Sequence, residues 1–202
     1  MENYRARKRV PDNVDKPNDA AAFIPSAKLG MWLFIIPIIM LFTAFTSAYL
    51  VRSNMGNWQS ITMPGVLWIN TVVLLLSSVT IQWAVRSVRK GNLTCLTIGF
   101  GITALLGILF FGGQIIAWHD LAASGIFVKS SPHSSFFYML TGLHGVHFLG
   151  GLLFLLYVFA QTLRVRYSAE HHATVDLCAT YWHFLDVLWL YLFLLMFVFR
   201  TT

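Results

Sequence analysis

The chain has 202 residues, of which 57% are hydrophobic and only 11% are charged. Since soluble domains carry about 25% charged residues, this composition, with a mean hydropathy of +0.67, excludes an ordinary soluble protein. The formal net charge is +6, but the basic residues lie beside apolar runs, where they set orientation and meet anionic lipid headgroups rather than nucleic acid.

Residues 1–28 form a polar arm that we expect to be an irregular cytoplasmic segment. Its basic residues are mixed with Pro11, Asp12, Asp15, Pro17 and Asp19, and no apolar period is present. A solvated leader without a function of its own is the favoured interpretation, and a docking strap is the alternative.

Five apolar runs follow the arm, and each is long enough to cross a bilayer. About 20 helical residues, each rising about 1.5 Å, span about 30 Å of hydrocarbon. The alternation typical of a membrane β-barrel is absent, and helices satisfy their own backbone in lipid. We therefore predict an all-α membrane protein with one five-helix transmembrane domain over residues 29–202. Its spans are expected at about 29–51, 66–85, 93–118, 136–163 and 175–199.

The 14 Lys and Arg residues are divided unevenly between the two sides of these spans. Eleven fall in the arm and in the second and fourth connections, and three fall on the other side. Because cytoplasmic segments carry the excess of basic residues, we expect the N-terminus inside and the C-terminus outside. The candidate contacts for lipid headgroups are Arg86, Arg164 and Arg166.

Small residues recur at helical spacing in the third and fourth runs. Small side chains let two helix backbones approach closely in a membrane, so these stripes predict tight helix packing and carry no information about a reaction. They comprise Gly99, Thr103 and Gly107 in the third run, and Thr141, Gly145, Gly150 and Gly151 in the fourth.

His144 and His147 are three residues apart and share one helix face. Such a pair could hold a metal or ligate haem, but a haem between two helices needs a matching histidine, and the other intramembrane histidine is His183. We favour a buried hydrogen bond between helices, for instance from His144 or His147 to Asp186. No catalytic residue, metal ligand or bound cofactor is predicted.

His183 and Asp186 are also three residues apart, in the last run. An ionised carboxylate at bilayer depth is costly unless it is partnered or neutral, so we expect Asp186 to point into the bundle. A proton relay is the alternative, but a relay needs a wet path. The flanking Trp182, Phe184 and Trp189 favour a dry structural contact.

The remaining histidines are expected in the connections, as solvated polar residues and weak metal candidates. His119, Asp120 and His133 are assigned to the third connection, and His171 and His172 to the fourth.

Taken in chain order, these motifs resemble subunit III of the haem-copper terminal oxidases, in its five-helix bacterial form. The resemblance passes through all five runs, and its last two motifs are long and specific. It rests on Leu29 to Phe34, Asn70-Thr71 with Ser77-Ser78, Gly113-Gln114, Phe137-Tyr138 with Thr141 to His147, and Tyr181 to Phe184 with Asp186 and Trp189.

The resemblance implies an accessory subunit without an active site of its own, in the inner (plasma) membrane of a bacterium. It would pack against catalytic subunit I and other oxidase subunits. The haems and copper would lie in subunit I, which reduces oxygen with electrons from cytochrome c or quinol and pumps protons. In that family subunit III stabilises the catalytic subunit, helps to sustain proton uptake and holds phospholipid in a cleft.

The chain also departs from that family. Its seven-helix members have two further N-terminal helices that form one side of the V-shaped lipid cleft. Their usual Ser-Glu pair is replaced here by Pro37-Ile38, and a glutamate of their third matching helix is replaced by Ala117. A proton-related role through that glutamate therefore does not carry over, and Pro37 is expected to bend the first helix.

Other functions remain open from the sequence. One is an independent haem-binding or quinone-reactive membrane subunit that uses His144, His147 and His183. Another is a subunit III-like partner of a nitric oxide reductase. A small transporter is a further alternative. It would normally show broken helices and inverted repeats, and the sequence offers only Pro37 and a single intramembrane acid, Asp186, in support.

Overall fold

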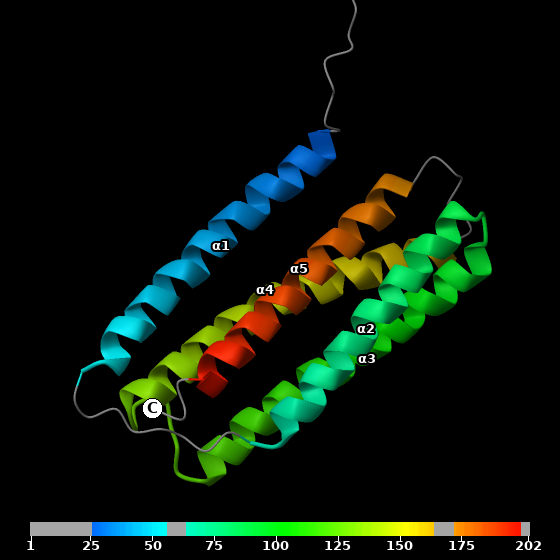
Figure 1. Cartoon of the computed structure of the whole chain (residues 1–202). Helices are drawn as coiled ribbons and strands as arrows, with labels where there is room; N and C mark the ends of the chain where they lie inside the picture. The colour runs from blue at the N-terminus through cyan, green and yellow to red at the C-terminus, as the bar shows by residue number, and fades with distance from the viewer. Residues whose placement is uncertain (1–25, 56–63, 164–171, 199–202) are drawn as a thin grey trace, which may run out of the picture.

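The computed structural model describes residues 26–55, 64–163 and 172–198. Within these ranges the chain forms five long helices: α1 (Ser26–Ser53), α2 (Val66–Arg89), α3 (Leu93–Ala123), α4 (Pro132–Leu163) and α5 (His172–Val198). All five are long and apolar enough to cross a membrane. Successive helices run in opposite directions (Figure 1), so the predicted bundle of five transmembrane helices is confirmed.

All five helices extend beyond their predicted spans by a few residues at one end or both, and in α3, α4 and α5 the extensions include residues assigned to connections. α3 continues to Ala123, and α4 begins already at Pro132, where a proline is favoured because the first helical N–H needs no partner. His119 and Asp120 therefore lie in α3, and His133 lies buried in the first turn of α4. The prediction that these three residues are solvated loop residues was wrong for their secondary structure, and for the burial of His133. His172 is the first residue of α5, so its assignment to the fourth connection was also wrong, and His171 lies outside the described residues.

A tight turn joins α2 to α3. Gly91 has a φ of 73°, a conformation that glycine adopts without strain. The Asn92 side chain then accepts a hydrogen bond of 3.0 Å from the Cys95 N–H, which caps the start of α3. The turn places α2 and α3 side by side and antiparallel, and they form the most extensive helix pair of the described residues (Figure 1).

Glycines on α3 and α4 allow the helices to approach closely. Glycine has no Cβ atom. If Gly99 carried one, it would lie 2.7 Å from the Ala84 Cβ of α2, and a Cβ at Gly107 would lie 2.7 Å from the Trp182 ring of α5. A Cβ at Gly151 of α4 would similarly overlap side chains of α5. The predicted close packing at these three glycines is confirmed.

α1 lies at the edge of the bundle, on the side away from α2 and α3 (Figure 1). It packs mainly against α4 and α5. In the most apolar 18-residue stretch of α1, 22% of the residues are buried, against 56% in the corresponding stretch of α5. The helix is continuous through Pro37, so the proline does not end it, and a bend there stays a prediction.

Candidate functional site

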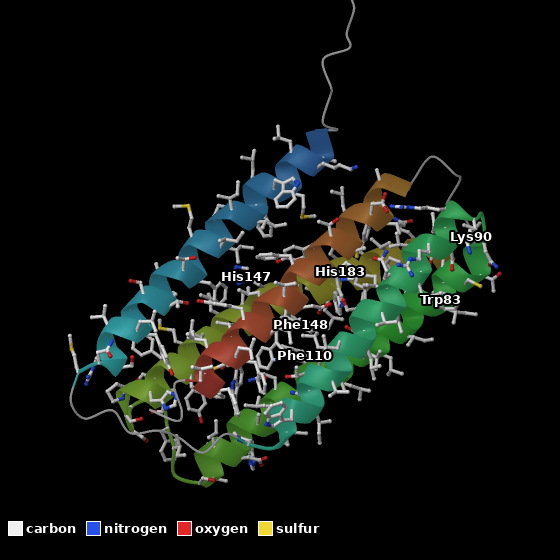
Figure 2. All side chains as sticks on the ribbon, viewed as in Figure 1. Trp83, Lys90, Phe110, His147, Phe148 and His183 are labelled. Carbon is white, nitrogen blue, oxygen red and sulfur yellow. The ribbon has the colours of Figure 1, made fainter. Side chains whose placement is uncertain are left out.

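Polar side chains of α2 and α5 meet in what we call the inner cluster, which comprises Ser78, Gln82, His183 and Asp186. The Ser78 Oγ lies 2.7 Å from His183 Nδ1, and Gln82 Oε1 lies 3.2 Å from His183 Nε2. An amide oxygen can only accept, so Nε2 carries the proton in this arrangement and, in a neutral ring, Nδ1 accepts from the Ser78 hydroxyl. Figure 2 shows His183 on α5, on the side that faces α2.

Asp186 lies one turn further along α5 and is 3% exposed. Its Oδ2 is 3.9 Å from His183 Nδ1, and the Ser78 hydroxyl also faces the carboxyl group. Neither carboxyl oxygen has a well-formed hydrogen bond to any residue that the structure describes. Asp186 therefore points into the bundle, as expected, and its nearest polar neighbours belong to the inner cluster.

The expected hydrogen bond from His144 or His147 to Asp186 is not formed. His147 Nδ1 lies 2.8 Å from the Leu143 carbonyl oxygen of its own helix. His144 has no hydrogen bond to any described residue. The two helices present these side chains to different neighbours. The His144 ring faces Phe110 of α3 and Trp189 of α5, whereas Asp186 faces Ser78 of α2.

His144 lies instead in an aromatic cluster where α3, α4 and α5 converge. Its ring centroid is 5.2 Å from that of Trp189, 6.0 Å from Phe148 and 6.3 Å from Phe110. Phe110 and Phe148 lie in the interior of the bundle (Figure 2). Trp189 Nε1 in turn donates a 3.1 Å hydrogen bond to Thr71 Oγ1 of α2, so all four helices from α2 to α5 meet around this cluster.

The intramembrane histidines are poorly placed to share a haem. His144 is enclosed by aromatic rings, His147 contacts its own backbone, and both nitrogens of His183 are engaged by α2. Within the described ranges no three His, Cys, Asp or Glu side chains come close enough to hold a metal ion. The geometry therefore does not favour the independent haem-binding alternative.

A hollow of about 320 Å³ lies at the end of the bundle where α1 and α5 begin and α2 ends. It is lined by side chains of both charges, among them Lys28, Arg89, Asp176 and, at its deep end, His183. Arg89 Nη2 and Asp176 Oδ1 form an exposed ion pair of 3.4 Å, a type that contributes little to stability.

A second hollow of about 510 Å³ lies along α2 and is lined by Ser78, Gln82, Trp83, Arg86 and His183. His183 thus borders both hollows, and about a third of its side chain is exposed. Asp186 is buried, as the prediction of dry surroundings expects, whereas the exposed part of His183 can face lipid or water, so for His183 dry surroundings stay a prediction. Arg86 lies at this hollow, while Arg164 and Arg166 lie outside the described residues, so all three stay candidate headgroup contacts.

Sequence reasoning missed Gln82 as a partner of His183. The available signal was spacing, because Ser78 and Gln82 are four residues apart and so share one face of an otherwise apolar run. It also missed that Trp182 Nε1 donates a 3.0 Å hydrogen bond to Ser77 Oγ, which fixes the same two helices to each other.

Comparison with known proteins gives one consistent family. The family model described as cytochrome c oxidase subunit III matches residues 16–201. Similar curated proteins named cytochrome c oxidase subunit 3 include those of Drosophila yakuba, 35% identical over 176 residues, and Anopheles gambiae, 32% identical over 176 residues. That of Loxodonta africana is 34% identical over 180 residues.

These alignments cover most of this chain and less of the relatives. They include 82%, 82% and 84% of the chain, but only 66%, 66% and 68% of the three relatives. The chain therefore spans about two thirds of the length of the curated relatives that it matches.

Proposed function

The chain belongs to the cytochrome c oxidase subunit III family, and we propose that it is the non-catalytic subunit III of a proton-pumping haem-copper terminal oxidase in aerobic respiration. The observation that carries the proposal is the family match over residues 16–201, which includes all five helices. The dispersed intramembrane histidines agree with a subunit whose chemistry lies elsewhere.

In this proposal the partner is catalytic subunit I, which holds the haems and copper and reduces oxygen with electrons from cytochrome c or quinol. This chain binds neither group and stabilises subunit I. The complex lies in the inner (plasma) membrane of a bacterium, with the N-terminus of this chain in the cytoplasm. The basic residues at the ends of the helices support that orientation, since cytoplasmic segments carry the excess.

Phospholipid is the further partner in this proposal. Arg86 borders the second hollow next to the indole of Trp83, and a basic side chain beside an interfacial tryptophan is typical of a headgroup contact. Lys28 and Arg89 add positive charge at the same end of the bundle. With Arg164 and Arg166, these residues would hold anionic headgroups on the cytoplasmic side.

The test is to tag the full chain at its C-terminus, purify it in mild detergent from its native membrane, and identify the chains that accompany it. The proposal predicts a large multi-helix partner, haem bands in the reduced-minus-oxidised spectrum and oxygen consumption in the same fraction. Purification with a nitric oxide-reducing complex would favour that alternative, and purification without haem or partner would contradict both.

A further inference from the structure

Besides Asp186, two further buried polar side chains of the bundle interior have no hydrogen bond to any residue that the structure describes. They are Gln114 of α3 and His144 of α4, which are 3% and 1% exposed. Both atoms of the Gln114 amide and both nitrogens of the His144 ring are fully buried. Buried polar groups in proteins are nearly always bonded to protein or to ordered water, so these four atoms require a partner.

The two side chains lie at neighbouring levels of the seam between α3 and α4. Gln114 is about one helical turn from Phe110 and from Trp118. The Phe110 ring contacts the His144 ring, with centroids 6.3 Å apart, and Trp118 Nε1 donates a 3.1 Å hydrogen bond to Thr141 Oγ1. Because Thr141 is one turn from His144, these two contacts place Gln114 and His144 at neighbouring levels of the seam between α3 and α4.

Two polar side chains nearby already form hydrogen bonds with other residues. Thr141 Oγ1 accepts from Trp118 and donates a 2.7 Å hydrogen bond to the Phe137 carbonyl. On α2, Asn70 Nδ2 donates to the Phe110 carbonyl at 3.4 Å. The aromatic rings that contact the His144 ring belong to Phe110, Phe148 and Trp189, and they offer it no strong acceptor.

We propose that Gln114 and His144 together bind an ordered water molecule in the seam between α3 and α4. A water molecule can donate two hydrogen bonds and accept two. The Gln114 amide supplies both a donor and an acceptor, and a neutral imidazole supplies one of each, so one water can bridge an amide atom of Gln114 to one ring nitrogen of His144. Buried waters typically make about three such bonds and are costly to remove.

This water gives the aromatic cluster a structural function that is independent of any oxidase partner. It fixes the rotation of the His144 ring and of the Gln114 amide where α2, α3, α4 and α5 meet. In an apolar interior an unsatisfied amide or imidazole is strongly unfavourable. The bound water therefore allows two polar side chains to remain in the core of a membrane bundle.

The direct test is a high-resolution cryo-electron microscopy map of the complex in which the full chain is purified. We expect a density peak about 2.7–3.2 Å from a Gln114 amide atom and from a His144 nitrogen, and its loss in the map of Gln114→Leu. A direct hydrogen bond between the two side chains, or separate protein partners for each, would overturn the proposal.

A double-mutant cycle provides a second readout. Gln114→Leu and His144→Leu should each lower the midpoint for thermal unfolding of this chain in the complex by roughly 2–12 °C, the range that one unsatisfied polar group causes in a chain of this size. The double variant should lose no more than the worse single variant, because neither group then lacks a partner. Fully additive losses would contradict a shared water.

The control is Ser87→Ala. The Ser87 hydroxyl bonds the Trp83 carbonyl of its own helix at 3.0 Å and is remote in sequence from this seam. Combined with Gln114→Leu, it should give an additive shift. If either leucine variant fails to assemble, the map of the unmodified complex still decides the proposal.

Discussion

α1 and α5 are both apolar enough to cross a membrane, yet they are held in the bundle very differently. α5 forms hydrogen bonds with α2 through Trp182, His183 and Trp189, and more than half of its most apolar window is buried. α1 is reached by the Tyr191 hydroxyl, which donates a 2.9 Å hydrogen bond to Thr46 Oγ1. Most of its apolar side chains face outward.

This difference follows from the solvent. Lipid tails are as apolar as leucine, so apolar side chains gain little by leaving lipid for a helix interface. Close packing at small residues and hydrogen bonds between helices then decide which helices are held firmly. α5 has both kinds of contact. α1 relies mainly on van der Waals contact with α4 and α5, and the outer face of α1 is left for lipid or for a partner.

The largest expected effect comes from a methyl group where α3 meets α2. Gly99→Ala should lower the free energy of unfolding by about 1–3 kcal/mol, because the new Cβ would lie 2.7 Å from the Ala84 Cβ and 3.2 Å from its Cα. The matched control is Gly30→Ala on α1, where no atom lies within 4 Å of the new Cβ. Unfolding of the reconstituted chain by denaturing detergent would measure both, and equal effects would show that α1 is packed as closely at Gly30 as α3 is at Gly99.

The next effect concerns the indole groups. Trp189→Phe should destabilise the chain by about 1 kcal/mol, since it removes the donor to Thr71 but keeps an aromatic ring beside Phe110. Trp32→Phe on α1 serves as the control, because that side chain is 55% exposed and such changes usually stay within about 0.5 kcal/mol. The same unfolding titration compares the two variants. A larger loss of stability in Trp32→Phe than in Trp189→Phe would contradict the view that α5 is held more firmly than α1.

The smallest effect is confined to α1. Tyr191→Phe removes the hydroxyl that bonds Thr46, and hydrogen bonds between membrane helices average about 0.6 kcal/mol. We expect a broader distribution of spin-label distances between α1 and α4, with no change between α2 and α3. Thr43→Val is the control, because the Thr43 hydroxyl bonds only its own helix within the described residues. An unchanged α1–α4 distribution in Tyr191→Phe would show that this bond does not hold α1.

The sequence predicted the number of helices and the inward direction of Asp186, because both follow from the cost of placing polar groups in lipid. It did not predict which groups Asp186 and His144 face. Those contacts depend on the rotation of α4 against α3 and α5, and an apolar run without a polar stripe leaves that rotation undetermined. It also ended α3 too early and began α4 too late along the chain. Polar residues such as His119 and His133 continue these helices beyond the apolar runs on which the predicted spans were based.

The central proposal is that polar contacts of α5 hold this chain together while, under the proposed function, the redox chemistry lies in a partner. The most direct measurement compares the complexes that carry Asp186→Ala or His183→Ala, and records for each the amount of this chain bound and the haem absorbance per catalytic subunit. We predict that the bound chain decreases and that the haem absorbance per catalytic subunit stays unchanged. A loss of haem absorbance while this chain remains bound would contradict the proposal.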